Sequence, residues 1–330
     1  PFDPKIKTFD LFIKHFYINQ IYYINYLHSY SLFIYKIIIM KYQLPHLINI
    51  PPFILREKLK NNNNIFKFFL ILLQGKLSSL VINYFQGLLF CLLMKMIFPF
   101  TEKLGYEDNK YFKIIEGQKI YFPNKRIVRI YLNPIEHLDR LYSSYCLEEI
   151  NFNKNDTVID CGANVGELNV ALKIKNIDIN YYAFEPDYQN FICLMENNLI
   201  HADNIFDSGL SNQNQSLKFF LDNEGGNSSF YDFGSEEYIE VNTLKLDDLE
   251  ISGPIKLIKI EAEGFEPEVL QGCSEKLKIT EFVCVDFGSE RGVNQENTVV
   301  DVNKILIKSG FELIKFSDFR YIGLYKNKNF

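Results

Sequence analysis

The chain has 330 residues, of which 47% are hydrophobic, and it carries a formal net charge of −6. This length suits one large domain or two modest ones, with enough apolar side chains for a sizeable core. The acidic balance and the absence of a dense Lys/Arg run argue against a nucleic-acid partner, because binding to phosphates relies on basic patches.

Cysteine and histidine spacing indicates no metal site. The six cysteines are widely spaced without a CxxC pair, and the five histidines show no HxxxH spacing. Neither a disulfide framework nor a zinc site is therefore signalled. We expect reduced, mostly buried thiols in a cytoplasmic protein, and no bound metal.

Residues 1–39 contain no methionine and are rich in Phe, Ile, Tyr, Lys and Asn, without a helical or strand period. Two interpretations stay open. The segment is translated upstream sequence and synthesis begins at Met40, or it is a genuine N-terminal element of a fragment. The intact mass of the native protein distinguishes them.

Residues 40–107 are predicted to form an N-terminal hydrophobic helical region. The uncharged run 77–94 reaches the lower length limit of a membrane span. Ser79, Asn83 and Gln86 nevertheless fall on one side of a helix, as in an amphipathic helix. We expect helical packing or peripheral membrane contact through residues 65–99 in preference to a span, and hence a cytoplasmic protein with membrane association.

From residue 108 to 330 the pattern changes to short apolar runs that alternate with helical segments. A hairpin turning at Glu116-Gly117 and a helix over 134–150 lead into this region. Alternating β and α elements predict a doubly wound, mainly parallel sheet. Strands are expected near 156–161, 180–185, 203–208, 255–261 and 281–286, with an inserted hairpin (LKFFL and YIEVNTL) and an antiparallel last pair (FELIKF and YIGLYKN).

The segment TVIDCGANVGELNVAL at 157–172 predicts a strand, a glycine turn and a helix beginning near Val165. In a doubly wound sheet the ligand crevice lies beyond the carboxyl ends of the strands, where Gly162 and Gly166 let the backbone approach a ligand. Asp160 ends the strand and can accept hydrogen bonds from ligand or loop. The alternative is a tight structural turn with a nucleotide site of another kind.

Glu185 ends the second strand, 19 positions after Gly166. A carboxylate at this place can accept both protons of a ribose diol. The structural alternative is a capping carboxylate before Pro186. A nicotinamide-binding fold shares this logic, but its usual GxGxxG is replaced here by GANVG.

Three carboxylates follow the fourth strand in IKLIKIEAEGFEPEVLQG: Glu261, Glu263 and Glu266. Close like charges raise at least one pKa, which suits a general base for a hydroxyl proton, and the same groups could bind a divalent cation. Alternatively, Glu266 and Glu268 simply favour the N-terminus of the next helix.

The ordered set VIDCGANVGE, FEP, GLSN, GGNSS, VNTLKLDDL and KIEAEGFEPEVLQG resembles the FkbM family of methyltransferases over roughly residues 108–330. The resemblance implies an α/β class I methyltransferase (Rossmann-like) fold. It also implies S-adenosyl-L-methionine as cofactor and O-methylation of a sugar or polyketide hydroxyl.

Carried over by position, the resemblance places Glu185 on the ribose and Ser208 and Gly209 near the adenine. The cofactor's methionine part would be surrounded by four residues: Asp160, Gly162, Asn164 and Gly166. The family pattern KIDxEG has Asp where this chain has Glu261, which keeps the charge and moves it by one methylene.

Further polar residues are predicted to contact the substrate: Asp286, Glu290 and Arg291 after the fifth strand, and Asn227, Ser228 and Ser229 on the turn of the inserted hairpin. The first group could equally hold a loop ion pair between Glu290 and Arg291. The second contains ordinary turn residues.

We expect methyl transfer to a hydroxyl of a sugar, glycan or lipid-linked saccharide, with Glu261 or Glu263 removing the hydroxyl proton. Two other classes stay open. One is an NAD(P)-dependent oxidoreductase on a Rossmann-like fold, which the GANVG loop disfavours, and the other is a non-catalytic binding module. Nothing in the sequence indicates an oligomeric state.

Overall fold

The computed structural model describes residues 65–101, 104–222, 228–251, 253–318 and 320–330. It separates into two compact units. One includes the described residues up to Phe85 together with Met96–Phe98, and the other includes Gln86–Lys95 and the described residues from Pro99 onward. Both interpretations of residues 1–39 concern residues outside this description, and the boundaries predicted at 39/40 and 107/108 stay predictions.

The uncharged run 77–94 is divided between two helices. Helix α4 (Ile65–Tyr84) ends before Phe85, and α5 (Gly87–Ile97) begins at a glycine with φ +58°. Such a positive φ belongs to the left-handed region that favours glycine. Within the part of the chain that is described, no helix has both the length and the apolar character that crossing a bilayer requires.

A small antiparallel sheet follows, made of β1 (Leu104–Glu107), β2 (Lys110–Ile115) and β3 (Gln118–Phe122). The predicted turn between β2 and β3 is confirmed. Glu116 and Gly117 both have positive φ, +49° and +82°, as two-residue hairpin turns require.

The edge of this sheet is held by Asn197 of α8 (Tyr188–Asn197). The Tyr121 N–H donates to Asn197 Oδ1 at 2.8 Å, and Asn197 Nδ2 donates to the Tyr121 carbonyl at 3.0 Å. The chain then enters a 3-10 helix, η2 (Lys125–Ile130), capped by the Asn124 side chain. Asn197 thus joins β3 to α8, and η2 follows directly after β3.

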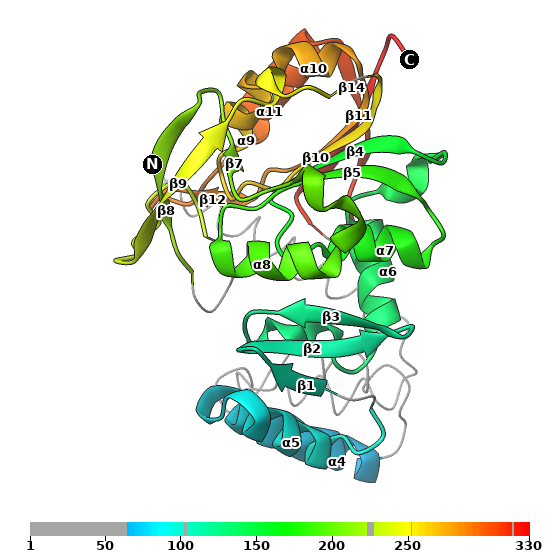
Figure 1. The fold of residues 1–330 in the computed structure, drawn as a ribbon, viewed down its shortest axis with the longest axis vertical. Coiled ribbons are helices and arrows are strands. Elements are labelled where there is room, and N and C mark those ends of the chain that lie inside the picture. Colours follow the sequence, from blue (N-terminus) through cyan, green and yellow to red (C-terminus); the bar gives the residue numbers. More distant parts are fainter. Residues whose placement is uncertain (1–64, 102–103, 223–227, 252, 319) are drawn as a thin grey trace, which may run out of the picture. The chain divides into compact units, whose positions relative to one another are not determined.

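The central sheet has seven strands, of which only β15 runs against the others. Figure 1 shows helices on both faces of this sheet. In spatial order the strands are β6 (Ile205–Phe206), β5 (Ile179–Phe184), β4 (Asp156–Cys161), β10 (Ile255–Ile260), β11 (Thr280–Asp286), β15 (Ile322–Asn327) and β14 (Phe311–Phe316). The predicted doubly wound, mainly parallel sheet and its antiparallel last strand are confirmed.

The inner strands β4, β10 and β11 are buried along most of their length because both of their faces are covered. Adjacent residues Leu257 and Ile258 on β10 belong to different hydrophobic clusters, one on each face. One face is covered by α6 (Pro134–Ser144), α7 (Glu167–Ile174) and α8, and the other by α9 (Glu266–Gln271), α10 (Ser274–Lys278) and α11 (Val299–Lys308).

The inserted hairpin is also confirmed. Strands β8 (Gln215–Phe220) and β9 (Tyr238–Leu244) pair antiparallel, and β7 (Gly209–Leu210) adds to β9 in parallel. The remaining elements are short: β12 (Ser289–Arg291), β13 (Glu296–Asn297), η3 (Leu147–Glu149), η4 (Leu199–Asn204) and η5 (Leu246–Asp248).

Three predicted elements differ in length from those observed. The helix predicted over 134–150 ends at Ser144, since Cys146 adopts a left-handed φ of +57°. The helix expected near Val165 begins at Glu167, and the strand expected over 203–208 is only Ile205–Phe206.

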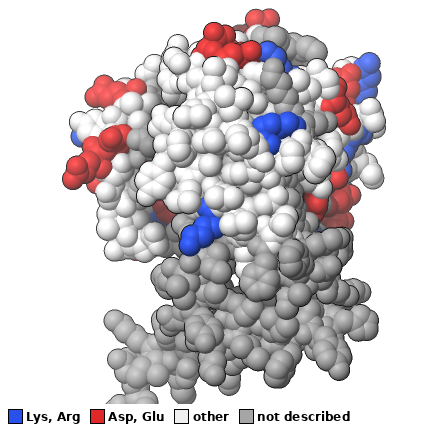
Figure 2. Space-filling view, turned by 90° about the horizontal axis from the view of Figure 1, so that it is seen from below, with Lys and Arg blue, Asp and Glu red and all other residues white. Residues whose placement is uncertain are grey.

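On the face seen in Figure 2, the described Lys and Arg side chains stand in separate small groups, and acidic side chains gather toward the edges. A broad basic area is not seen among the described residues of this face.

Candidate active site

A cavity of about 450 Å³ opens at the carboxyl ends of β4, β5 and β10. This is the crevice in which doubly wound sheets bind ligands, and its volume suits a small molecule. Five of the seven residues predicted to bind a cofactor line it: Asp160, Gly162, Asn164, Glu185 and Gly209.

Gly162 brings the loop after β4 against the end of β10. Its φ is +74°, and a Cβ at this position would lie 1.9 Å from the Glu261 carbonyl oxygen. Only glycine fits such a backbone approach. The glycine therefore joins the two segments from which the site is built.

The other two predicted cofactor residues do not line the cavity. A Cβ on Gly166 would lie 2.2 Å from Asn198 Nδ2, so this glycine permits close packing between the start of α7 and the end of α8. The Ser208 hydroxyl is buried without a hydrogen-bond partner among the described residues. It directly precedes Gly209, which does line the cavity.

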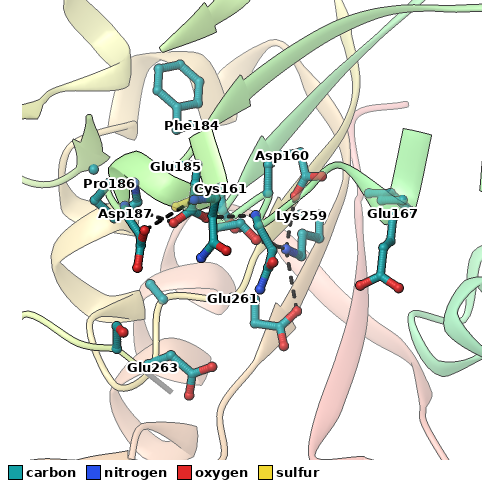
Figure 3. A pocket seen from close by; sticks show the side chains of 18 of the residues that line it. Asp160, Cys161, Glu167, Phe184, Glu185, Pro186, Asp187, Lys259, Glu261 and Glu263 are labelled. Carbon is teal, nitrogen blue, oxygen red and sulfur yellow. Dashed lines mark hydrogen bonds and ion pairs between the residues drawn. The ribbon is translucent and has the colours of Figure 1, made fainter. Parts of the chain in front are cut away.

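Glu185 follows β5 and is held by two backbone N–H groups. Asn164 donates to Oε2 at 2.7 Å and Asp187 donates to Oε1 at 2.9 Å. Burial raises the pKa of this carboxyl group to about 7. Figure 3 shows Glu185 beside Asp187 at one side of the cavity. The loop after β4 and the end of β5 are thus locked together by a carboxylate that faces the ligand space.

Lys259 is the charge centre of the site, although its side chain is only 3% exposed. Its Nζ lies 2.9 Å from Asp160 Oδ1 and 3.4 Å from Glu261 Oε2, and it donates to the Gly162 carbonyl at 2.8 Å. Figure 3 shows Lys259 between the two carboxylates. Tyr181 donates to the second Asp160 oxygen at 2.5 Å. Because both Asp160 oxygens face protein groups, this residue's direct contact with a ligand stays a prediction.

Glu261 is surrounded by donors. Arg320 and the Tyr145 hydroxyl both donate to its carboxylate. Burial favours the neutral acid, but Lys259 and Arg320 outweigh it and hold the pKa of Glu261 well below its ordinary range. A carboxylate kept ionised so firmly is a weak base.

Glu263 is the opposite case. Its Oε2 is buried without a hydrogen-bond partner in the described chain, and its backbone has a positive φ of +48°. Burial, together with Glu290 and Glu261, raises its pKa far above the ordinary value. In Figure 3 it lies apart from the Lys259 cluster. Of the two predicted catalytic carboxylates, only Glu263 has a raised pKa, and the catalytic role of both stays a prediction.

Glu266 differs from the prediction that it crowds the same place. Its Oε1 accepts from the Ala262 and Gly264 N–H groups at 3.2 and 2.9 Å, and its Oε2 accepts from Thr298 Oγ1 at 2.8 Å. It is buried and does not line the cavity. Its contacts hold the turn after β10.

Arg291 also differs from the prediction. It forms two hydrogen bonds to Glu268, at 2.7 and 3.0 Å, and lies over the Tyr231 ring. It does not line the cavity, and the expected loop ion pair with Glu290 is replaced by the pair with Glu268.

Of the other predicted substrate residues, Ser228 and Glu290 line the cavity. Ser229 lies behind it and donates to the Glu263 carbonyl at 2.7 Å. Asp286 is engaged by Arg320 at 2.5 Å. Asn227 lies outside the described residues.

The basic residues that line the cavity were not predicted from the sequence. Four cations line the cavity: Arg126, Arg129, Lys259 and Arg320. A signal existed for Lys259, which interrupts an apolar strand two residues before Glu261. Another existed in KRIVRI, where two arginines stand three residues apart.

The seven-stranded order with one antiparallel strand, the glycine loop after β4 and the acidic residue after β5 define a Rossmann-like class I methyltransferase fold. Residues 160–313 match the family described as the methyltransferase FkbM domain. The match covers 154 of the 330 residues and includes the glycine loop, Glu185 and Glu263.

A curated relative is the hexuronic acid methyltransferase AglP of Haloferax volcanii, which is 28% identical over 158 residues. The alignment covers 46% of this chain and 62% of the relative, which is less than two thirds of the relative's length.

Two solved structures illustrate the structural matches. One is a SAM dependent methyltransferase from Aquifex aeolicus, with 16% identity and a TM-score of 0.33 over 58% of this chain and 96% of that chain. The other is M. jannaschii TYW2 in complex with AdoMet, with 12% identity and a TM-score of 0.35 over 68% and 86%.

Proposed function

We propose that this protein is an S-adenosyl-L-methionine-dependent O-methyltransferase that acts on a hydroxyl of a sugar, glycan or lipid-linked saccharide. The observation that carries the proposal is a single cavity in the FkbM domain that is lined by the glycine loop, Glu185 and Glu263. The name of the relative AglP, a hexuronic acid methyltransferase, supports a sugar acceptor.

The residues around the cavity fit the cofactor. Glu185 presents a carboxylate suited to a ribose diol, and the loop at Gly162 to Asn164 leaves room for the amino-acid part. Phe219 and Phe230 line the cavity beside Gly209, where a Cβ would lie 2.5 Å from the Phe230 ring, and their apolar rings suit an adenine. When bound, S-adenosyl-L-methionine supplies a methyl group on a positively charged sulfur.

The two carboxylates have different tasks in this proposal. Glu261, ionised and fixed by Lys259 and Arg320, provides a permanent negative charge. Glu263 is protonated at neutral pH in the ligand-free cavity, because burial and acidic neighbours raise its pKa. A bound cationic ligand would lower that pKa, and Glu263 in its ionised form could then accept the proton of the acceptor hydroxyl.

The first test is calorimetric titration of S-adenosylhomocysteine into the wild-type protein, Glu185→Ala and Glu281→Ala. Glu281 is a matched control, since it lies on β11 and pairs with Lys256 at 2.8 Å, and it does not line the cavity. We expect micromolar binding that is lost only in Glu185→Ala. Folded wild-type protein that bound NADH but not S-adenosylhomocysteine would favour the oxidoreductase instead, and cofactor binding without any transfer would favour a binding module.

We also propose peripheral membrane contact through residues 65–99. Helix α5 exposes Leu88, Leu89 and Leu92, with more than half of each side chain accessible. Apolar side chains at such positions can enter the headgroup boundary of a bilayer. Sedimentation with liposomes should carry down the wild-type protein and not Leu88→Ser/Leu92→Ser, and equal amounts of both in the supernatant would contradict this proposal.

A further inference from the structure

Arg126 and Arg129 differ from the other described arginines in having no carboxylate partner. They stand three residues apart on η2, and a 3-10 helix has three residues per turn, so they share one side of it. Both line the cavity. The other three arginines in the described part of the chain are each paired: Arg140 with Glu136, Arg291 with Glu268, and Arg320 with Glu261 and Asp286.

The acidic groups near these two arginines are already engaged. Glu167 interacts electrostatically with both, yet its Oε1 lies 3.1 Å from His137 Nε2. Glu261 is held by Arg320, Lys259 and Tyr145. The two guanidinium groups therefore face one further carboxylate, Glu167, and positive charge is in excess at this part of the cavity.

The environment of Arg129 agrees with an unmatched cation. Arg129 is exposed to solvent and lines the cavity. Desolvation by the surrounding atoms and the like charge of Arg126 lower its pKa. Two guanidinium groups held together at such a cost are stabilised when an anion binds between them.

We propose that Arg126 and Arg129 form a subsite that binds a carboxylate group of a ligand inside the cavity. This inference rests on the proposed function, which offers two sources of a carboxylate, the amino-acid end of the cofactor and an acidic sugar acceptor. The planar guanidinium forms paired hydrogen bonds with carboxylates, which suits either source. Figure 3 shows Glu167 on the far side of Lys259 from Glu185, so the subsite lies toward the end of the cavity away from the ribose carboxylate.

The fold does not depend on these two side chains. Helix η2 is anchored by Ile127 and Ile130, which are buried in the core, and by the Asn124 cap. Replacing either arginine with glutamine removes a charge and keeps most of the side chain's length. The variants should therefore fold like the wild-type protein.

The experiment titrates wild-type protein, Arg126→Gln/Arg129→Gln and the control Arg140→Gln by calorimetry. The first probes are S-adenosylhomocysteine and 5′-methylthioadenosine, which keeps the nucleoside and lacks the amino-acid carboxylate. The second pair is glucuronate and its neutral counterpart glucose, each added to protein saturated with S-adenosylhomocysteine.

We expect the double variant to lose at least tenfold in affinity for one carboxylate ligand, with 5′-methylthioadenosine binding unchanged within twofold. Loss for S-adenosylhomocysteine assigns the subsite to the cofactor, and loss for glucuronate alone assigns it to the acceptor. Unchanged S-adenosylhomocysteine affinity with unchanged or absent glucuronate binding would overturn the inference, as would an equal loss for 5′-methylthioadenosine. Wild-type protein that binds no S-adenosylhomocysteine would instead refute the proposed function.

Discussion

Replacing Lys259 with methionine should destabilise the domain far more than replacing its strand neighbour Lys256. Lys259 Nζ is buried, and it lies 2.9 Å from Asp160 Oδ1 and 3.4 Å from Glu261 Oε2. Methionine has a similar length and no charge, so the variant leaves two buried carboxylates without their shared cation.

The magnitude follows from these distances. With an effective dielectric constant of about 20, the two attractions amount to about 6 and about 5 kcal/mol. Desolvation of the lysine opposes them, and removal of one partner from a buried ion pair costs about 3–5 kcal/mol in practice. Arg320 still faces Glu261, which places the expected loss near the lower end of that range.

The assay is chemical denaturation at pH 7.5, followed by circular dichroism. Lys256→Met is the control on the same strand, because Lys256 pairs with a single carboxylate, Glu281, and both side chains are only partly buried. Lys259 helps to hold the folded-state pKa of Glu261 below its ordinary value, so this pair contributes stability above the unfolded-state pKa of about 4 and loses it as the pH falls through the lowered folded-state pKa. The difference in stability between wild-type protein and Lys259→Met should therefore shrink in acid. A loss within 1 kcal/mol of the control, or one that does not shrink in acid, would refute the charge-centre reasoning.

Three further outcomes follow from the site. Glu185 has a pKa of about 7 in the ligand-free folded protein, above its pKa in the unfolded chain. This group therefore stabilises the fold at a pH below its unfolded-state pKa, and the contribution is lost as the pH rises through about 7. If the ligand binds the ionised form, S-adenosylhomocysteine affinity should rise about tenfold from pH 6 to 8, and calorimetry of Glu185→Gln should show no such slope. Gly162→Ala should cost more than about 2 kcal/mol in denaturation, against about 1 for Gly117→Ala, which has a similar positive φ but open space around its Cβ. Glu263→Gln should lower kcat by about 10² or more and leave S-adenosylhomocysteine affinity nearly unchanged; an equal effect on Kd would show that Glu263 serves binding rather than proton transfer.

The fold was predictable where local pattern decides. Strands β4, β10 and β11 are apolar on both faces, and the turn at Glu116-Gly117 has the residues that a tight hairpin needs. Prediction failed where a single backbone angle or pairing decides. Cys146 ends a helix by its left-handed φ, and only two residues of the stretch 203–208 pair with β5.

In the site, Glu185, Gly162 and Glu263 could be placed from the sequence, because each follows a strand and the ligand crevice of a doubly wound sheet lies at the carboxyl ends of its strands. The side chains that balance or hydrogen-bond the Glu261 carboxylate could not be found in this way. Tyr145 reaches Glu261 across 116 residues, and Arg320 reaches it across 59. The protonation difference between Glu261 and Glu263 depends on these distant partners, so no local motif contains it.

Strand β15 has a consequence for the order in which the domain assembles. It sits between β11 and β14, although it follows both in the chain. During synthesis these two strands keep unpaired edges until residues 322–327 arrive, and such edges invite pairing with other chains. Arg320 stands just before β15, so insertion of this strand also brings the cation that faces Glu261 and Asp286. Closure of the sheet and completion of the site's charge balance are then one late folding event.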